Sequence, residues 1–198
     1  MEARAKQHFK KRRRFGGIVA VLAFFSAWLP GATLNAAEVV VTEPQVKALC
    51  LLNFAKYVTW PETSFTATNS PIRIGVIGDS KIHDELKRAV EGKTINGRAI
   101  EVAGAGGVAE VGRCHILFVS GSDKARVRET IAAVRSDAVL TVGEGSEFVE
   151  GGGMIVFVKR ENKVRFEVNL AAARAEKLKI SSKLLALADA VRGKGEAE

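Results

Sequence analysis

Histidine and cysteine, which most often carry nucleophilic, acid–base or metal chemistry, are scarce in this sequence. It has three histidines and two cysteines in 198 residues. No His, Cys, Asp or Glu cluster has metal-ligand spacing, and the lack of a CxxC pair argues against a thiol-redox enzyme. Cys114 and His115 are adjacent, but neighbours on a strand point to opposite faces and make a poor nucleophile–base pair. The sequence therefore predicts no catalytic, metal or cofactor site.

Nucleotide-binding fingerprints are missing as well. Gly75 to Asp79 follows a β-rich run and precedes a helical pattern, which is the context of a nucleotide turn. The segment matches neither GxGxxG nor GxxxxGK[ST]. We expect a tight strand–helix turn in which Asp79 or Ser80 caps the helix. A small-ligand crevice at these strand ends is the alternative.

Basic charge is concentrated at the amino terminus. Residues 1–37 hold seven of the 30 Lys and Arg residues and one of the 22 acidic residues, so the net charge of +8 falls to +2 without them. An uncharged apolar run, Phe15 to Trp28, follows the basic stretch and precedes the small residues Ala36 and Ala37. This order is typical of a secretory signal peptide cut near Ala37. We expect export to the periplasm and no nucleic-acid binding; an uncleaved membrane anchor is the alternative.

The remaining chain has no second apolar run of membrane-spanning length, and its pattern predicts one α/β domain over residues 38–192 with a disordered tail at 193–198. We expect a mixed sheet of six strands flanked by helices. The expected strands are 72–77, 99–102, 115–119, 138–142, 154–158 and 164–168. The expected helices are 44–57, 81–90, 124–135, 170–176 and 182–191, with glycine-rich links at 103–112 and 143–153. The last two of these strands are joined by Arg160 to Lys163, and a connection that short predicts a C-terminal antiparallel hairpin.

The two cysteines, Cys50 and Cys114, would enter an oxidising compartment. There they either form a disulfide or remain separate buried thiols.

Apolar residues that the helical and loop patterns leave on a surface are candidates for binding a partner. These candidates are Tyr57, Trp60, Phe148, Ile180 and Leu185, of which Trp60, beside Pro61, is expected to remain partly exposed.

Six segments, in order and at plausible spacing, resemble the YfiR-like family of periplasmic proteins. The opening helix VKALCLLNFAKYVTWP, the strand IRIGVIG and the central strand CHILFV are each similar to family blocks. The later blocks are LTVG followed by Phe148 and GGMI, then VRFEVN, then LKISSKLLALA. No single block is a strong signature, whereas the ordered set covers nearly all of the chain after residue 37.

The resemblance implies a small α/β domain with a regulatory, non-enzymatic role. The best-understood relative is a periplasmic repressor that binds the sensor region of an inner-membrane diguanylate cyclase, and an outer-membrane lipoprotein can draw it away. Relatives often have a cysteine at the position of Gly75, bonded to the one matching Cys114, and Gly75 cannot form that bond. We expect a periplasmic repressor in cyclic-di-GMP signalling, for which a homodimer is compatible with the sequence. A periplasmic small-ligand binder is the alternative, and an enzyme would rest only on the Cys114–His115 pair.

Overall fold

The computed structural model describes residues 41–121 and 123–193, which all belong to one compact unit. The expected signal peptide, its cleavage point and nearly all of the expected tail lie outside the described residues. Within the described part, no helix is long and apolar enough to cross a membrane.

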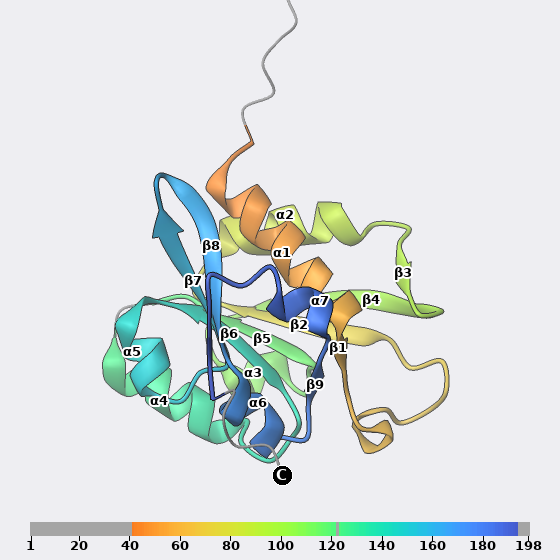
Figure 1. Cartoon of the computed structure of the whole chain (residues 1–198). Helices are drawn as coiled ribbons and strands as arrows, with labels where there is room; N and C mark the ends of the chain where they lie inside the picture. Colours follow the sequence, from red (N-terminus) through yellow and green to blue (C-terminus); the bar gives the residue numbers. More distant parts are fainter. Residues whose placement is uncertain (1–40, 122, 194–198) are drawn as a thin grey trace, which may run out of the picture. The chain divides into compact units, whose positions relative to one another are not determined.

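An eight-stranded mixed sheet forms the centre of the described domain, in the order β10-β8-β7-β6-β5-β2-β4-β3 (Figure 1). The strands are β2 Ile72–Ile77, β3 Thr94–Ile95, β4 Arg98–Ala105, β5 Ile116–Val119, β6 Leu140–Glu144, β7 Ile155–Arg160, β8 Lys163–Asn169 and β10 Ala190–Arg192. The middle of the sheet, from β4 through β2, β5 and β6 to β7, is parallel, whereas β7 and β8 are antiparallel. A separate antiparallel pair joins β1, Val58–Thr59, to β9, Lys179–Ile180.

Helices cover both faces of the sheet, which explains why its central strands are almost wholly apolar. On one face lie α1 Glu43–Tyr57 and α2 Ser80–Val90; on the other lie α3 Val108–Val111, α4 Lys124–Ala133 and α5 Gly145–Glu150 (Figure 1). Side chains of β5 alternate between the two cores: Ile116 and Phe118 face α1 and α2, while Leu117 and Val119 face α4 and α5. The shorter helices are η1 Glu62–Ser64, α6 Leu170–Ala175 and α7 Ser182–Leu185.

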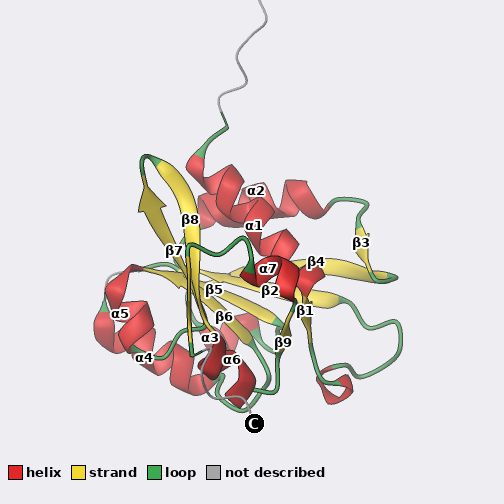
Figure 2. Cartoon of the chain, viewed as in Figure 1, coloured by secondary structure: helices red, strands yellow, loops and turns green. Residues whose placement is uncertain are grey.

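The mixed sheet and the C-terminal hairpin, both predicted from the sequence, are confirmed (Figure 2). The β7–β8 turn places Glu161 and Asn162 at positive φ (48° and 59°), the backbone of a two-residue turn that matches strand twist. The strand number was underestimated, because β3 and β10 are only two or three residues long. The predicted helix over 182–191 is wrong in its second half: α7 ends at Leu185, and Ala190–Arg192 pairs with β8. The two glycine-rich links also contain α3 and α5.

Candidate functional site

The loop between α1 and β2 is anchored on the sheet by an aromatic stack. Trp60 is only 7% exposed, and its indole Nε1 donates a 3.0 Å hydrogen bond to the His115 carbonyl. The Phe65 ring stacks on the His115 ring with 4.5 Å between centroids, and the Arg98 guanidinium lies 3.8 Å from the Phe65 centroid. The expectation that Trp60 stays partly exposed is wrong, because its N–H finds a backbone acceptor inside the protein.

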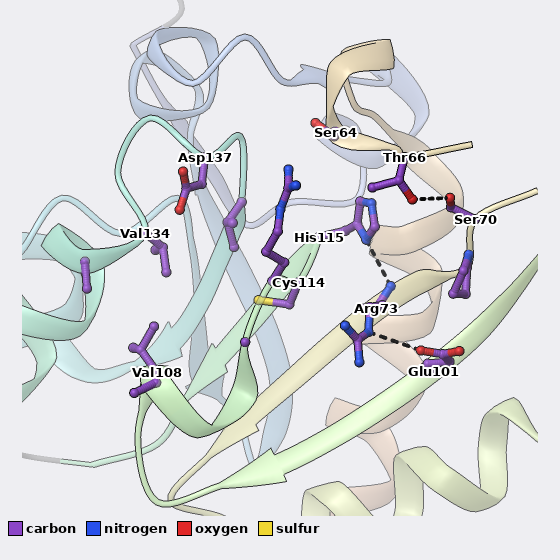
Figure 3. Close-up of a pocket in the computed structure, with 16 residues that line it drawn as sticks. Ser64, Thr66, Ser70, Arg73, Glu101, Val108, Cys114, His115, Val134 and Asp137 are labelled. Atoms are coloured by element: carbon purple, nitrogen blue, oxygen red, sulfur yellow. Dashed lines mark hydrogen bonds and ion pairs between the residues drawn. The ribbon is translucent and has the colours of Figure 1, made fainter. Parts of the chain in front are cut away.

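Beside this stack, a groove of about 520 Å³ lies at the amino ends of the parallel strands (Figure 3). Its polar lining consists of Ser64, Thr66, Ser70, Arg73, Arg113 and His115, and its apolar lining includes Val108, Ala109, Val134 and Val139. Two carboxylates, Glu101 and Asp137, also line it, and Glu101 Oε2 lies 3.1 Å from Arg73 Nε. Figure 3 shows Asp137 and Val134 across the hollow from His115.

His115 is held in one tautomer with one ring nitrogen unused. Its Nδ1 accepts a 3.0 Å hydrogen bond from the Arg73 backbone N–H, so the neutral ring carries its proton on Nε2. Nε2 and the Ser64 hydroxyl are both buried without a hydrogen-bond partner among the described residues. Burial lowers the pKa of His115, as do the guanidiniums of Arg98, Arg113 and Arg73. The Ser64 carbonyl opposes this pKa shift, but its contact with the ring falls short of hydrogen-bond geometry.

This lowered pKa makes domain stability depend on pH. Because the unfolded His115 binds a proton more readily than the folded one, its contribution is complete above the unfolded pKa of about 6.5. It is lost as the pH falls from there through the lower pKa of the folded state. We expect the free energy of unfolding to fall between about pH 7.5 and 5.5 more steeply in the native protein than in His115→Asn. Asparagine keeps an acceptor for the Arg73 N–H but does not titrate. Urea denaturation at several pH values measures both slopes; equal slopes would contradict the assignment.

The two cysteines do not form a disulfide. Cys50 on α1 packs against the core on the α1–α2 face, whereas Cys114 packs against the core on the opposite face. The sheet therefore separates them, and of the two alternatives that the sequence left open, the structure shows separate thiols. Burial raises the pKa of Cys114 to about 12, so its thiol is not ionised at neutral pH.

The turn after β2 is a helix cap, as predicted. Asp79 Oδ1 accepts hydrogen bonds from the backbone N–H groups of Lys81 and Ile82 at 2.9 and 3.0 Å. At Gly78, a Cβ would lie 2.5 Å from the Ser120 carbonyl oxygen, so the backbone after β5 packs directly against this turn. The groove lies at the opposite end of these strands from the crevice considered in the sequence.

Three of the five predicted partner-binding residues lie together. The β1–β9 pair sets Val58 opposite Ile180, and the Ser181 N–H donates to the Tyr57 carbonyl at 2.9 Å. Tyr57, Ile180 and Leu185 are all half-buried against the core, and α7 packs on α1. Just beyond α7, Leu187 is 65% exposed.

Phe148 does not belong to this surface. Its side chain is 0% exposed, in the core under α4 and α5. It cannot contact a partner without unfolding of α5, so its prediction as a binding residue is wrong. Trp60, at 7% exposure, is likewise a packing residue.

A second groove, of about 460 Å³, lies between α1 and the β7–β8 hairpin. The buried Lys47 ammonium lies 2.6 Å from Glu43 and 2.8 Å from Glu144. Burial alone would lower the pKa of Lys47, but its bonds to Glu144 and Glu43 outweigh burial and raise it. In this groove, the charge of Lys47 is therefore paired with those of Glu43 and Glu144.

Sequence reasoning missed the groove because its lining comes from separate segments. Arg73, Arg113, His115 and Asp137 each lie close to the start of a parallel strand, and only the strand order brings them together. The available signal for the groove was the presence of polar residues just before, or at the start of, buried strands. In the described part of the chain, no group of three or more His, Cys, Asp or Glu side chains could hold a metal ion.

Comparison with solved structures supports the fold. A conserved domain protein from Vibrio cholerae O1 biovar El Tor str. N16961 has 13% sequence identity and a TM-score of 0.51, with 77% of this chain and 61% of that chain covered. This chain thus spans less than two thirds of that protein. The ABC domain in complex with L-Trp from Streptococcus pneumonia has 12% identity and a TM-score of 0.44, covering 61% of this chain and 55% of its own, which is too low to support an argument.

No curated protein matches the chain at a significant level. The profile of a family described as YfiR/HmsC-like matches residues 44–189, nearly the whole described domain and all the blocks noted in the sequence. This protein therefore belongs to the YfiR/HmsC-like family.

Proposed function

We propose that this protein is a periplasmic regulator that binds the sensor region of an inner-membrane signalling protein and represses a diguanylate cyclase. The match over residues 44–189 carries the proposal, because the YfiR-like family is known for regulating diguanylate cyclases. The basic, apolar and small-residue order of residues 1–37 supports export. An outer-membrane lipoprotein that competes for the regulator would complete the circuit.

The surface around the β1–β9 pair is our candidate for the sensor contact. It presents the half-buried side chains of Tyr57, Ile180 and Leu185, and Leu187 follows at 65% exposure. Large exposed apolar side chains are typical of protein–protein contacts when they gather on one surface. Leu49 on α1 is a further exposed large apolar side chain, at 46% exposure.

Repression requires no chemistry on the regulator. Binding shifts the sensor toward its inactive conformation only if the regulator binds that conformation more tightly than the active one. A shift from 1:99 to 99:1 requires about a 10⁴-fold difference in affinity between the two conformations. Removal of the regulator by a competing lipoprotein would reverse the shift.

Deletion of the gene is expected to raise cellular cyclic-di-GMP, and complementation should reverse the rise only with a version that carries residues 1–37. The leader is required because the proposed sensor region lies outside the cytoplasm. Cyclic-di-GMP is measured by mass spectrometry of cell extracts. Unchanged cyclic-di-GMP after deletion, or full complementation by the version without residues 1–37, would contradict the proposal.

The same complementation assay tests the contact surface. Leu187→Asp places a charge on the exposed position after α7 and should abolish repression at normal protein level. Val41→Asp is the matched control, because Val41 is 54% exposed just before α1 and outside the proposed surface. Both substitutions should change stability by no more than about 0.5 kcal/mol. Equal repression by the two variants would exclude this surface.

A further inference from the structure

We propose that the groove at the amino ends of the parallel strands binds a small organic carboxylate with an apolar body. The carboxylate would be held by the Arg113 guanidinium and the His115 Nε2–H. This site goes beyond the proposed repressor function and would give the protein a chemical input. The two proposals are tested separately, since binding is measured on the purified protein alone.

The first argument is the hydrogen-bonding demand of the groove. His115 is 7% exposed, and its Nε2 must carry the proton because Nδ1 accepts from the Arg73 backbone. Nε2–H and the Ser64 hydroxyl, both residues lining the groove, have no hydrogen-bond partner in the described structure. Buried polar groups in native proteins nearly always have partners. The Nε2–H has only the Ser64 carbonyl near it, outside hydrogen-bond geometry, which indicates a missing acceptor. A carboxylate oxygen accepts from both a ring N–H and a hydroxyl.

The second argument is charge. Three guanidiniums, those of Arg98, Arg113 and Arg73, influence the His115 ring. Arg73 is paired with Glu101, and Arg98 donates to the carbonyls of the 61–71 loop while it covers Phe65. Arg113 is exposed and has no ion pair within the described residues, so its charge is available to an anion.

The third argument is the opposite wall. Val108 and Ala109 from α3, with Val134 and Val139 around the end of α4, give this side an apolar lining that is interrupted only by the Asp137 carboxylate at its rim. Figure 3 shows Val108 and Val134 across the hollow from His115. The volume of about 520 Å³ lies within the range of small-molecule sites. A ligand with one carboxylate and an apolar body matches both walls, whereas a highly charged phosphate compound would leave the apolar wall unused.

Ligand entry involves the loop that covers the donors. Nε2 and the Ser64 hydroxyl are closed to solvent, and Phe65 of the same loop stacks on the imidazole. A carboxylate that reaches Nε2 must therefore displace the Ser64 side of the loop. We expect binding to change the environment of the His115 ring as well as to stabilise the fold.

The probe is 2-naphthoate, with 2-naphthamide as its uncharged analogue. Titration into the purified protein should raise the thermal midpoint saturably, with a Kd of about 1 mM or tighter, and the amide should not. The ¹⁵N resonances of the His115 ring should shift along the same binding curve. Arg113→Gln should weaken 2-naphthoate binding at least tenfold, a loss typical of one charged contact. Arg165→Gln, at an exposed position on the β7–β8 hairpin, should bind within twofold of the native protein.

Three results would overturn the proposal: no saturable effect of 2-naphthoate up to about 10 mM, equal binding of the amide, or equal weakening by Arg113→Gln and Arg165→Gln. If Nε2 and Ser64 are instead bridged by a buried water, the His115 resonances will stay unchanged at every probe concentration, which also overturns it. His115→Asn gives a second check, because it keeps the Arg73 contact but removes the Nε2–H. His115→Asn should bind 2-naphthoate more weakly, because the hydrogen bond from the imidazole N–H is lost. Its thermal midpoint without the probe should remain measurable.

Discussion

Phe148→Ala is expected to lower the free energy of unfolding by about 3–5 kcal/mol. The ring is completely buried on α5 and packs against β5 and α4 side chains in the core of that face. Gly143 and Gly153 flank the ring on two sides, and glycines have no side chains that could move into the space left by its removal. Urea denaturation measures the loss, and Leu187→Ala, at an exposed position, is the control that should remain within about 0.5 kcal/mol of the native protein.

The glycines give a complementary form of this prediction. A Cβ built on Gly153 would lie 2.0 Å from Phe148 Cε1, and one on Gly143 would lie 2.3 Å from Phe148 Cδ2. Gly153→Ala should therefore cost about 1–3 kcal/mol through overpacking. Combining it with Phe148→Leu should recover part of that cost, since the two sites are in contact. Gly107→Ala is the matched control, because a Cβ there meets nothing within 4 Å. Purely additive effects of Gly153→Ala and Phe148→Leu would show that the ring and the glycine do not compete for this space.

Phe148 also shows where sequence reasoning failed. Glycines around an aromatic residue favour an exposed loop when only local pattern is considered. In the structure, Gly143 belongs to β6 and Gly153 precedes β7, and their missing side chains make room for the ring between them. The same glycines that indicated a loop are packing residues, and only the pairing of β6 with β7 makes this visible.

The six longer strands could be predicted because each is an apolar run bounded by turn residues. The short strands could not, because β1 and β9 hold two residues each and exist only through their mutual pairing. The C-terminal segment illustrates the competition: 182–191 has helical spacing, yet the Asp189 N–H donates to the Phe166 carbonyl and directs Ala190–Arg192 to the edge of β8. Pairing with the free hydrogen-bonding groups at the edge of β8 therefore outweighed the local helical preference of this segment.

The candidate groove was less predictable than the fold. Cys114 and His115 were recognised as adjacent and as a poor catalytic pair, and their environments agree with that reasoning. The unused Nε2 of His115 depends on the Arg73 backbone, 42 residues away, and on the loop that carries Phe65. Such a feature is a product of tertiary structure, and no spacing in the sequence encodes it.

Gly75→Cys combined with Val111→Ala is expected to form a disulfide with Cys114 and to stabilise the oxidised protein by about 2–4 kcal/mol relative to its reduced form. A Cβ on Gly75 would lie 3.6 Å from Cys114 Sγ, within reach of a bridge after a small adjustment. The same Cβ would lie 2.4 Å from Val111 Cγ1, which explains the second substitution. Val111→Ala alone is the reference, because it accounts for the packing lost on removal of the valine methyl groups.

Thiol labelling and urea denaturation with and without reductant test this bridge. The oxidised double variant should retain one free thiol, that of Cys50, because Cys50 lies on the other face of the sheet. Burial raises the pKa of Cys114 to about 12, so Cys114 supplies almost no thiolate at neutral pH and bridge formation depends on the introduced cysteine. Oxidation should therefore be slow without a catalyst and faster at higher pH. Three labelled thiols after prolonged oxidation would show that a cysteine at position 75 cannot reach Cys114. Cys114 would then be free in this protein for a reason other than the glycine at position 75.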